Sequence, residues 1–336
     1  MTRPITLFTG QWADLPFEEV ARLAGEWGYD GLEIACWGDH LDVHRGATDD
    51  DYIQGRLDIL KKNNLQVFTI ANHLTGQAVC DDPIDERHEG ILSKDVWGDG
   101  DAEGVRQRAA EAMKDTARTA ARLGVKTVTG FSGSSIWKCV AMFPPASDGM
   151  IQRGYEDFAR RWNPILDVFD EVGVRFALEV HPSEIAYDYW TAKRTMEAVG
   201  GRDAFGFNFD PSHFIWQDLD PVMFVQDFAD KIFHVHVKES IKQLNGRNGR
   251  LGSHLPWADP RRGWDFVTAG HGDVPWEPIF RTLNAIGYEG PTSLEWEDAG
   301  MDRLDGAPEA LALVKRLNAI APPAAAFDAA FSTRQS

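Results

Sequence analysis

The stretch FALEVHP at 176–182 is typical of a buried β-strand that ends on a carboxylate, here Glu179. A helical pattern follows, and the same order of apolar run, polar end and helix recurs further along the chain. In a barrel of parallel strands the C-terminal ends converge on one mouth, so polar side chains at those ends are expected to meet. The recurrences are FGFNFDPSH at 205–213 with Asp210, IFHVHVKES at 232–240 with His236, and TSLEWED at 292–298 with Glu295.

Strand and helix patterns alternate along the rest of the chain as well. Eight such pairs predict one (β/α)8 TIM barrel over residues 1–320, followed by an Ala/Pro-rich tail at 321–336. A doubly wound open sheet is the alternative, but polar ends spread over strands five to eight favour closure. The expected strands are 5–9, 31–36, 65–71, 125–131, 176–180, 205–210, 232–238 and 292–297, and the expected helices are 16–28, 49–63, 101–123, 151–172, about 190–199, about 220–230, 275–287 and 307–320.

Two connections are longer than a barrel requires, one after strand three and one after strand seven. They cover about 72–100 and about 239–275 and contain Trp, His and Arg residues. Long structured connections in compact domains are usually functional or disordered, and this composition argues against simple disorder. We therefore expect these loops to wall the mouth of the barrel, to recruit a partner, or both.

The four polar strand ends predict a metal site. Three carboxylates and one imidazole repel one another unless a cation lies between them. This oxygen-rich set suits Mn²⁺ or Mg²⁺ best, with Co²⁺ and Zn²⁺ as alternatives. Side chains two apart in a strand share a face. That rule pairs Glu179 with His181, Asn208 with Asp210, His236 with His234 and Lys238, and Glu295 with Glu297.

Charge and composition exclude several classes of partner. The chain has 336 residues with 34 basic and 52 acidic side chains, a net charge of −18, so it should repel nucleic acid and anionic membranes. The three cysteines form no CxxC pair, which argues against a disulfide framework. Since we find neither an apolar run of membrane-spanning length nor a signal-peptide core, we expect a cytoplasmic protein.

The motifs FDPSH, HVHVKE, GHGDVPW and YEGPTSLEWED resemble those of the xylose-isomerase-like barrels of the sugar phosphate isomerase/epimerase superfamily. The resemblance covers roughly residues 5–320. It implies one divalent metal held by Glu179, Asp210, His236 and Glu295, with Glu179 and Glu295 also acting as the acid/base pair. His213, in DPSH, is similar to the substrate-binding histidine that follows the metal aspartate.

Six further residues complete the predicted site, five of them with an alternative. His181 and Lys238 contact the substrate or orient the metal ligands. Glu33 and His73 end strands two and three, where they line the pocket or lie on its rim. Lys138 follows strand four and places a charge at the pocket edge, or is simply exposed. His271, in the long loop 239–275, approaches the ligand. We count His181, His213 and Lys138 with the catalytic candidates, and Glu33, His73, Lys238 and His271 with the substrate-binding ones.

Such a site is suited to enolising a keto-sugar, which leads to an isomerase, an epimerase or a lyase. The long loops and aromatic strand ends exceed what a small free sugar needs. The chain is also similar to the large subunits of bacterial C-glycoside deglycosidases, which cleave the carbon–carbon bond of 3-keto glycosides together with a small β-sandwich subunit. We favour this lyase, expect an oligomer, and keep a free keto-sugar isomerase or epimerase as the alternative. An abasic-site endonuclease is disfavoured by the negative charge.

Overall fold

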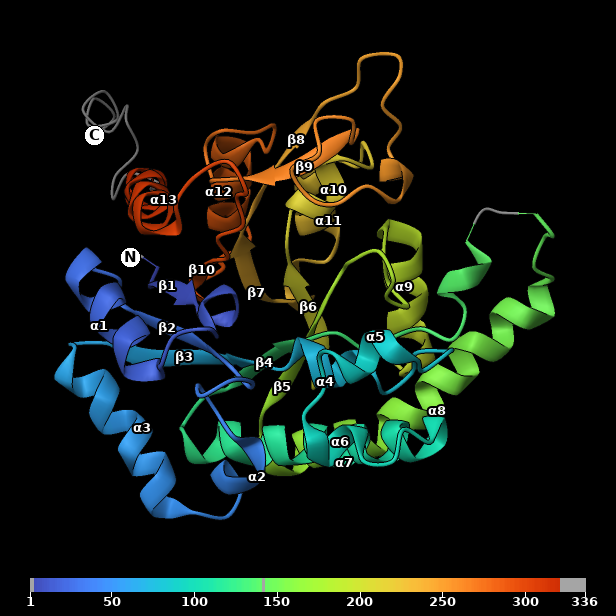
Figure 1. Cartoon of the computed structure of the whole chain (residues 1–336), viewed down its shortest axis with the longest axis horizontal. Coiled ribbons are helices and arrows are strands. Elements are labelled where there is room, and N and C mark those ends of the chain that lie inside the picture. Colours follow the sequence, from blue (N-terminus) through green and yellow to red (C-terminus); the bar gives the residue numbers. More distant parts are fainter. Residues whose placement is uncertain (1–2, 141–142, 321–336) are drawn as a thin grey trace, which may run out of the picture.

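A closed barrel of eight parallel strands forms the centre of the molecule (Figure 1). The computed structural model describes residues 3–140 and 143–320, so the tail predicted at 321–336 lies outside the described residues. β1 pairs with β10 through Ile5 and Thr292, which closes the ring and rules out an open sheet. The barrel strands are β1 (Ile5–Phe8), β2 (Gly31–Ala35), β3 (Gln66–Ala71), β4 (Thr127–Gly130), β5 (Arg175–Glu179), β6 (Phe205–Phe209), β7 (Ile232–Val237) and β10 (Thr292–Leu294).

Helices surround the barrel, and their ends follow local capping signals. The Asp101 side chain accepts a hydrogen bond from the Gly104 amide where α7 begins, and α8 ends at Gly173 with φ of 68°, a left-handed conformation that favours glycine. The long helices are α1 (Phe17–Trp27), α3 (Asp50–Lys62), α7 (Ala102–Arg122), α8 (Asp148–Val172), α9 (Tyr189–Ala198), α11 (Pro221–Asp227), α12 (Trp276–Ala285) and α13 (Arg303–Asn318).

Aromatic side chains fill the layer between the barrel and its helices. Trp162 of α8 stacks on Phe176 of β5 with ring centroids 4.5 Å apart, and Phe176 in turn contacts Phe205 of β6. All three are fully buried. Apolar burial on this scale is the main stabilising contribution to a barrel of this size, and it fixes the strands whose ends carry the polar residues.

Both long connections contain structure of their own. The connection after β3 holds α4 (His73–Gln77), α5 (Glu86–Glu89) and α6 (Lys94–Trp97). The connection after β7 forms an antiparallel hairpin of β8 (Glu239–Lys242) and β9 (Trp264–Val267), which the sequence did not predict. The hairpin lies beside α10 (Ser212–Ile215), because the Ser240 hydroxyl donates to the Ser212 carbonyl at 2.8 Å (Figure 1).

The remaining elements are short. They are α2 (Val43–Gly46), η1 (Gly10–Trp12), η2 (Trp137–Cys139), η3 (Ala229–Lys231) and η4 (Gly252–His254). Over residues 3–140 and 143–320, we find no helix with the length and hydrophobicity that crossing a bilayer demands.

Candidate metal centre

The four predicted metal ligands meet at one end of the barrel. Glu179 ends β5, Asp210 directly follows β6, His236 lies in β7, and Glu295 directly follows β10. Each offers one ligand atom, and these atoms all lie within 4.8 Å of one another. All four side chains are buried; Glu295, the least buried, is 7% exposed. The structure therefore brings together the set that strand ends predicted.

Several buried atoms of this cluster have no hydrogen-bond partner among the described residues. They include Oδ2 of Asp210, Oε2 of Glu295 and Nε2 of His213. Nε2 of His213 lies 3.2 Å from the Asp210 oxygen, and Nδ1 of His236 lies 2.8 Å from the Glu295 oxygen, yet neither contact has hydrogen-bond alignment. Unpartnered buried carboxylate oxygens are costly. A divalent cation bound by oxygen and imidazole would satisfy them, so the residues fit the expected metal.

Glu179 is the most heavily contacted carboxylate of the cluster. Its Oε2 accepts a hydrogen bond from Nδ2 of Asn208 at 3.0 Å and lies 3.1 Å from Nε2 of His73. Burial raises the pKa of Glu179, but contacts with His213, His236 and His73 outweigh it and hold that pKa well below its usual value. Glu179 is therefore ionised at neutral pH.

Glu295 is held by an ammonium group. Nζ of Lys238 lies 3.0 Å from Oε1 of Glu295 and 3.0 Å from Oε1 of Glu297, and Nε2 of Gln11 donates to the same Glu295 oxygen at 2.8 Å. Burial raises the pKa of Glu295, but Lys238 and His236 lower it to about 2. The sequence missed Gln11, because η1 carries no motif that marks it as part of a site. Lys238 also lies 4.4 Å from the centre of the Phe266 ring.

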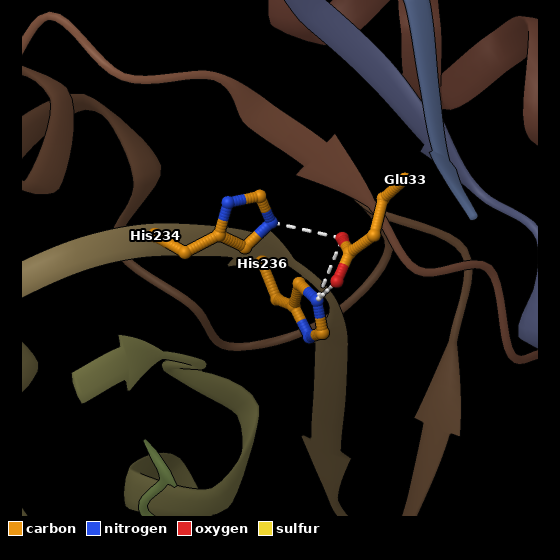
Figure 2. A group of neighbouring side chains, drawn as sticks. All are labelled: Glu33, His234 and His236. Atoms are coloured by element: carbon orange, nitrogen blue, oxygen red, sulfur yellow. Dashed lines mark hydrogen bonds and ion pairs between the residues drawn. The ribbon is translucent and has the colours of Figure 1, made fainter. Parts of the chain in front are cut away.

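A second polar group lies inside the barrel, on the other edge of the His236 ring (Figure 2). Oε2 of Glu33 lies 2.8 Å from Nε2 of His234 and 3.0 Å from Nε2 of His236. All three side chains have 0% exposure. The sequence placed Glu33 at the end of strand two, but it lies in the middle of β2, from where its side chain points to the two histidines inside the barrel (Figure 2). Burial raises the pKa of Glu33, but the two histidines lower it well below its usual value.

Two further histidines border the cluster. The His181 and His213 rings meet edge to face with centroids 4.1 Å apart, and each offers an atom within 4.8 Å of Glu179. Burial and His213 hold the pKa of His181 well below its usual value, so this ring is neutral. Burial lowers the pKa of His213, but Asp210 and Glu179 raise it to about 9. His73 contacts Glu179 as well, so the three predicted histidines His73, His181 and His213 all lie at the cluster.

Lys138 and His271 are not brought to the cluster. Among the described residues, the one ion pair of Lys138 is with Asp82, and its side chain is 53% exposed. His271 pairs with Glu309 at 2.7 Å and is about half exposed. Lys138 is thus exposed, as its alternative had it, and both side chains belong to surface ion pairs; the pocket-edge charge and the loop contact stay predictions.

Aromatic rings frame the site. Phe8 at the end of β1 stacks on His236 with centroids 5.3 Å apart, and Trp37 meets His73 edge to face at 6.3 Å. On the hairpin, Phe266 contacts His213 at 5.7 Å. The sequence drew attention to loop tryptophans but missed Phe8 and Phe266. Phe266 could not be assigned without the hairpin that carries it.

Comparison with known proteins places this geometry in a family. Residues 21–317 match the xylose isomerase-like TIM barrel family. The chain belongs to that family. It is 26% identical to the uncharacterized protein YfiH of Bacillus subtilis (strain 168) over 317 residues, which are 88% of this chain and 93% of YfiH.

Two solved structures share the fold. The probable 3-DHS dehydratase AsbF, involved in petrobactin synthesis, from Bacillus anthracis has a TM-score of 0.64 and 17% identity, over 93% of this chain and 98% of that one. The 3-keto-D-glucoside 4-epimerase YcjR from E. coli has a TM-score of 0.63 and 15% identity, over 94% and 99%. At 15–17% identity, these two structures show only that this chain shares their fold. The chemistry of this chain has to be argued from its own site.

Proposed function

We propose that this protein is a divalent-metal-dependent enzyme that removes a proton from the carbon next to the carbonyl of a keto-sugar. One observation carries the proposal: a buried cluster of three carboxylates and one imidazole contains oxygens that lack hydrogen-bond partners. The nearby Lys238 balances only part of its negative charge. A dication is the simplest group that satisfies both the charge and the unpartnered atoms.

The bound cation would polarise the carbonyl of the substrate. Glu179 and Glu295 enter the site from β5 and β10, two strands that do not pair with each other, so they reach the substrate from different directions. Glu179, held by Asn208 and His73, is oriented to take up a proton. Glu295 is ionised, so the proton that it returns to the carbon or passes to a leaving group would come from the ammonium group of Lys238, which contacts it at 3.0 Å.

The finer proposal is a lyase that cleaves the C-glycosidic bond of 3-keto glycosides. Its support is the aromatic wall of the hairpin, which reaches the site through Phe266 and continues outward through Trp257. Trp216 and Trp264 stack beside it at 4.7 Å with planes 3° apart. Such flat apolar surfaces suit an aromatic leaving group. A small partner subunit and an oligomeric assembly belong to this proposal.

The second candidate is an epimerase or isomerase acting on a free keto-sugar. The observation in its favour is the pair of carboxylates on separate strands, since a proton removed by one and returned by the other inverts the carbon. This reaction needs no leaving group and leaves the aromatic wall without a role. We therefore rank it second.

Proton NMR in D₂O with the Mg²⁺-loaded protein distinguishes the two. The probes are a 3-keto C-glycoside of a flavonoid and a ketohexose. Release of the aglycone supports the lyase. Deuterium exchange or a new sugar from the ketohexose, without aglycone release, supports the epimerase or isomerase and overturns the lyase. The reaction is also run with Mn²⁺, and this paramagnetic ion is removed before the spectrum is recorded. If neither probe changes with either metal, the proposal of an enolising enzyme is wrong.

A further inference from the structure

Glu33, His234 and His236 form an inner group, and the metal site alone does not explain why Glu33 and His234 are buried beside the ligand His236 (Figure 2). We propose that Glu33 is a positioning residue that fixes His236 with its proton on Nε2 and so presents the lone pair of Nδ1 to the metal cluster. The inference deepens the proposed function, because it concerns the same metal centre. Its central claim, the location of one proton, is measurable without any turnover.

The hydrogen bonds at the two edges of the His236 ring agree on that location. Nδ1 also lies 2.8 Å from Glu295 and 3.3 Å from Glu179, but neither contact has hydrogen-bond alignment, and both lie on the side where the cation would bind. Nε2 lies 3.2 and 3.0 Å from Oε1 and Oε2 of Glu33, and an ionised carboxylate can only accept. At the other edge, Nδ1 lies 3.1 Å from Nδ2 of Asn208. That same Nδ2 donates to Glu179, which fixes it as the amide nitrogen and not the oxygen. Since an amide nitrogen only donates, Nδ1 must accept, and the proton belongs on Nε2.

The neighbours of Glu33 leave it no alternative arrangement. The Thr129 hydroxyl donates to Oε1, while His234 donates from Nε2 to Oε2 at 2.8 Å. The other ring nitrogen of His234, Nδ1, lies 3.2 Å from the Thr69 hydroxyl, which can supply its proton. Phe8 stacks on the His236 ring with planes 23° apart and restrains its rotation. Every polar atom facing Glu33 is therefore a donor, and each is used.

This complete pairing argues against a second ion between Glu33 and the two histidines. Within the described ranges, Glu33, His234 and His236 leave no buried polar atom without a partner, whereas Asp210 and Glu295 do. A cation there would have to break the hydrogen bonds that Glu33 receives from Thr129 and both histidines, whereas a cation at Nδ1 of His236 would replace only the contact with the Asn208 amide. The inner group is thus a support for a metal ligand, the arrangement in which a histidine donates its other N–H to a carboxylate.

The test compares three variants in Mn²⁺ affinity, measured by electron paramagnetic resonance of free Mn²⁺. Glu33→Met removes both acceptors and should weaken Mn²⁺ binding about 10- to 100-fold, the usual effect of losing such a support. Glu33→Gln keeps one accepting oxygen and should lie between Glu33→Met and the unchanged protein. The matched control is Glu111→Gln, which neutralises an exposed carboxylate on α7 and should leave Mn²⁺ affinity unchanged. Affinities of both Glu33 variants within about twofold of the unchanged protein would overturn the proposal.

A second measurement keeps the proposal testable if the Glu33 variants do not fold. Histidine ¹H–¹⁵N spectra of the unchanged, Mg²⁺-loaded protein should show His236 protonated on Nε2 only. A proton on Nδ1 alone would overturn the inference whatever the variants do. The outcome is separable from that of the proposed function. Weak Mn²⁺ binding by Glu33→Met together with no keto-sugar turnover by the unchanged protein would support the inference and contradict the function. Turnover with Mn²⁺ affinity unaffected in Glu33→Met would do the reverse.

Discussion

The two edges of the His236 ring face two groups of the same chemistry with opposite properties. On the Nε2 side, Glu33 and His234 are fully buried and every polar atom is paired. On the Nδ1 side, Asp210 and Glu295 are also buried but keep unpartnered oxygens among the described residues. Residue type and burial do not separate the two groups; hydrogen-bond satisfaction does. A paired carboxylate is a structural support, whereas two unpaired ones that converge on one imidazole at the same depth indicate a place for a cation.

The largest effect on turnover should come from the unpaired side, the Nδ1 side of His236 where Asp210 and Glu295 keep unpartnered oxygens. Glu295→Gln keeps the shape of the side chain but removes its capacity to transfer a proton, so turnover should fall by about 10²- to 10⁴-fold. The measurement is the rate of aglycone release or solvent-deuterium exchange at saturating Mg²⁺, with circular dichroism to verify the fold. Glu309→Gln, at the surface pair with His271, is the control and should keep full turnover. Full turnover by metal-loaded Glu295→Gln would remove this residue from the chemistry.

Metal loading should stabilise the protein, again through the unpaired side. A ligand at 100 times its Kd stabilises the folded state by about 2.7 kcal/mol, so Mn²⁺ should raise the Tm by several degrees and EDTA should reverse the rise. Asp210→Asn should abolish most of this shift because it removes a ligand charge. Differential scanning calorimetry with and without Mn²⁺ measures both. An equal shift in Asp210→Asn would show that the ion binds elsewhere.

A third buried carboxylate sharpens the comparison through pH. Glu184 accepts from the backbone amides of Ser132 and Gly133 at 2.6 and 2.7 Å, while its other oxygen has no hydrogen-bond partner among the described residues. Burial and nearby Asp81 raise its pKa from 4.5 to about 8. Between these values the folded state keeps a proton that the unfolded state has lost. The free energy of unfolding should therefore fall as pH rises, by up to about 1.4 kcal/mol per pH unit.

Denaturant unfolding between pH 5.5 and 7 measures this slope. Glu184→Gln cannot titrate and should flatten it by about 2 kcal/mol over that interval. Glu111→Gln, on the exposed side of α7, is the matched control and should leave the slope as it is. If Glu184→Gln keeps the slope of the unchanged protein, the carboxylate of Glu184 is ionised in the fold despite its burial.

The smallest effect, on stability alone, should come from the paired side, the Nε2 side of His236 where Glu33 and His234 lie. Thr129→Val removes one donor to Glu33 while preserving volume, and should cost about 1 kcal/mol of folding free energy. Mn²⁺ affinity should change little, because both histidines still donate to Glu33. Urea unfolding and a Mn²⁺ titration measure the two quantities. If Thr129→Val lost much Mn²⁺ affinity while its folding free energy stayed the same, Thr129 would act in metal binding and not in supporting Glu33.

Much of the candidate site could be predicted from the sequence because strand ends are local features. Glu179, Asp210, His236 and Glu295 each close an apolar run, and barrel geometry alone brings such ends together. Strand ends say less about Lys138 and His271, because these lie in connections whose direction depends on partners such as Asp82 and Glu309, far away in the chain.

The β8–β9 hairpin was missed for a related reason. Its pairing joins Glu239 to Val267 across a loop of more than twenty residues, which periodicity over a short window does not detect. Because the hairpin was not predicted, Phe266 was missed as well, although its ring contacts His213 and Lys238. The aromatic wall was therefore anticipated only as a set of tryptophans in loops.

Alternation and helical spacing are set by near neighbours along the chain, so the barrel, its eight strand–helix pairs and the polar residues at the strand ends follow from sequence patterns. Which of those residues are paired follows only from the folded barrel. Glu33 in β2 and Glu295 just after β10 are both buried glutamates. Glu33 meets two imidazole N–H groups, yet Oε2 of Glu295 has no hydrogen-bond partner among the described residues. That difference depends on which strands close around His236, and hydrogen bonds between distant strands form only when the barrel does.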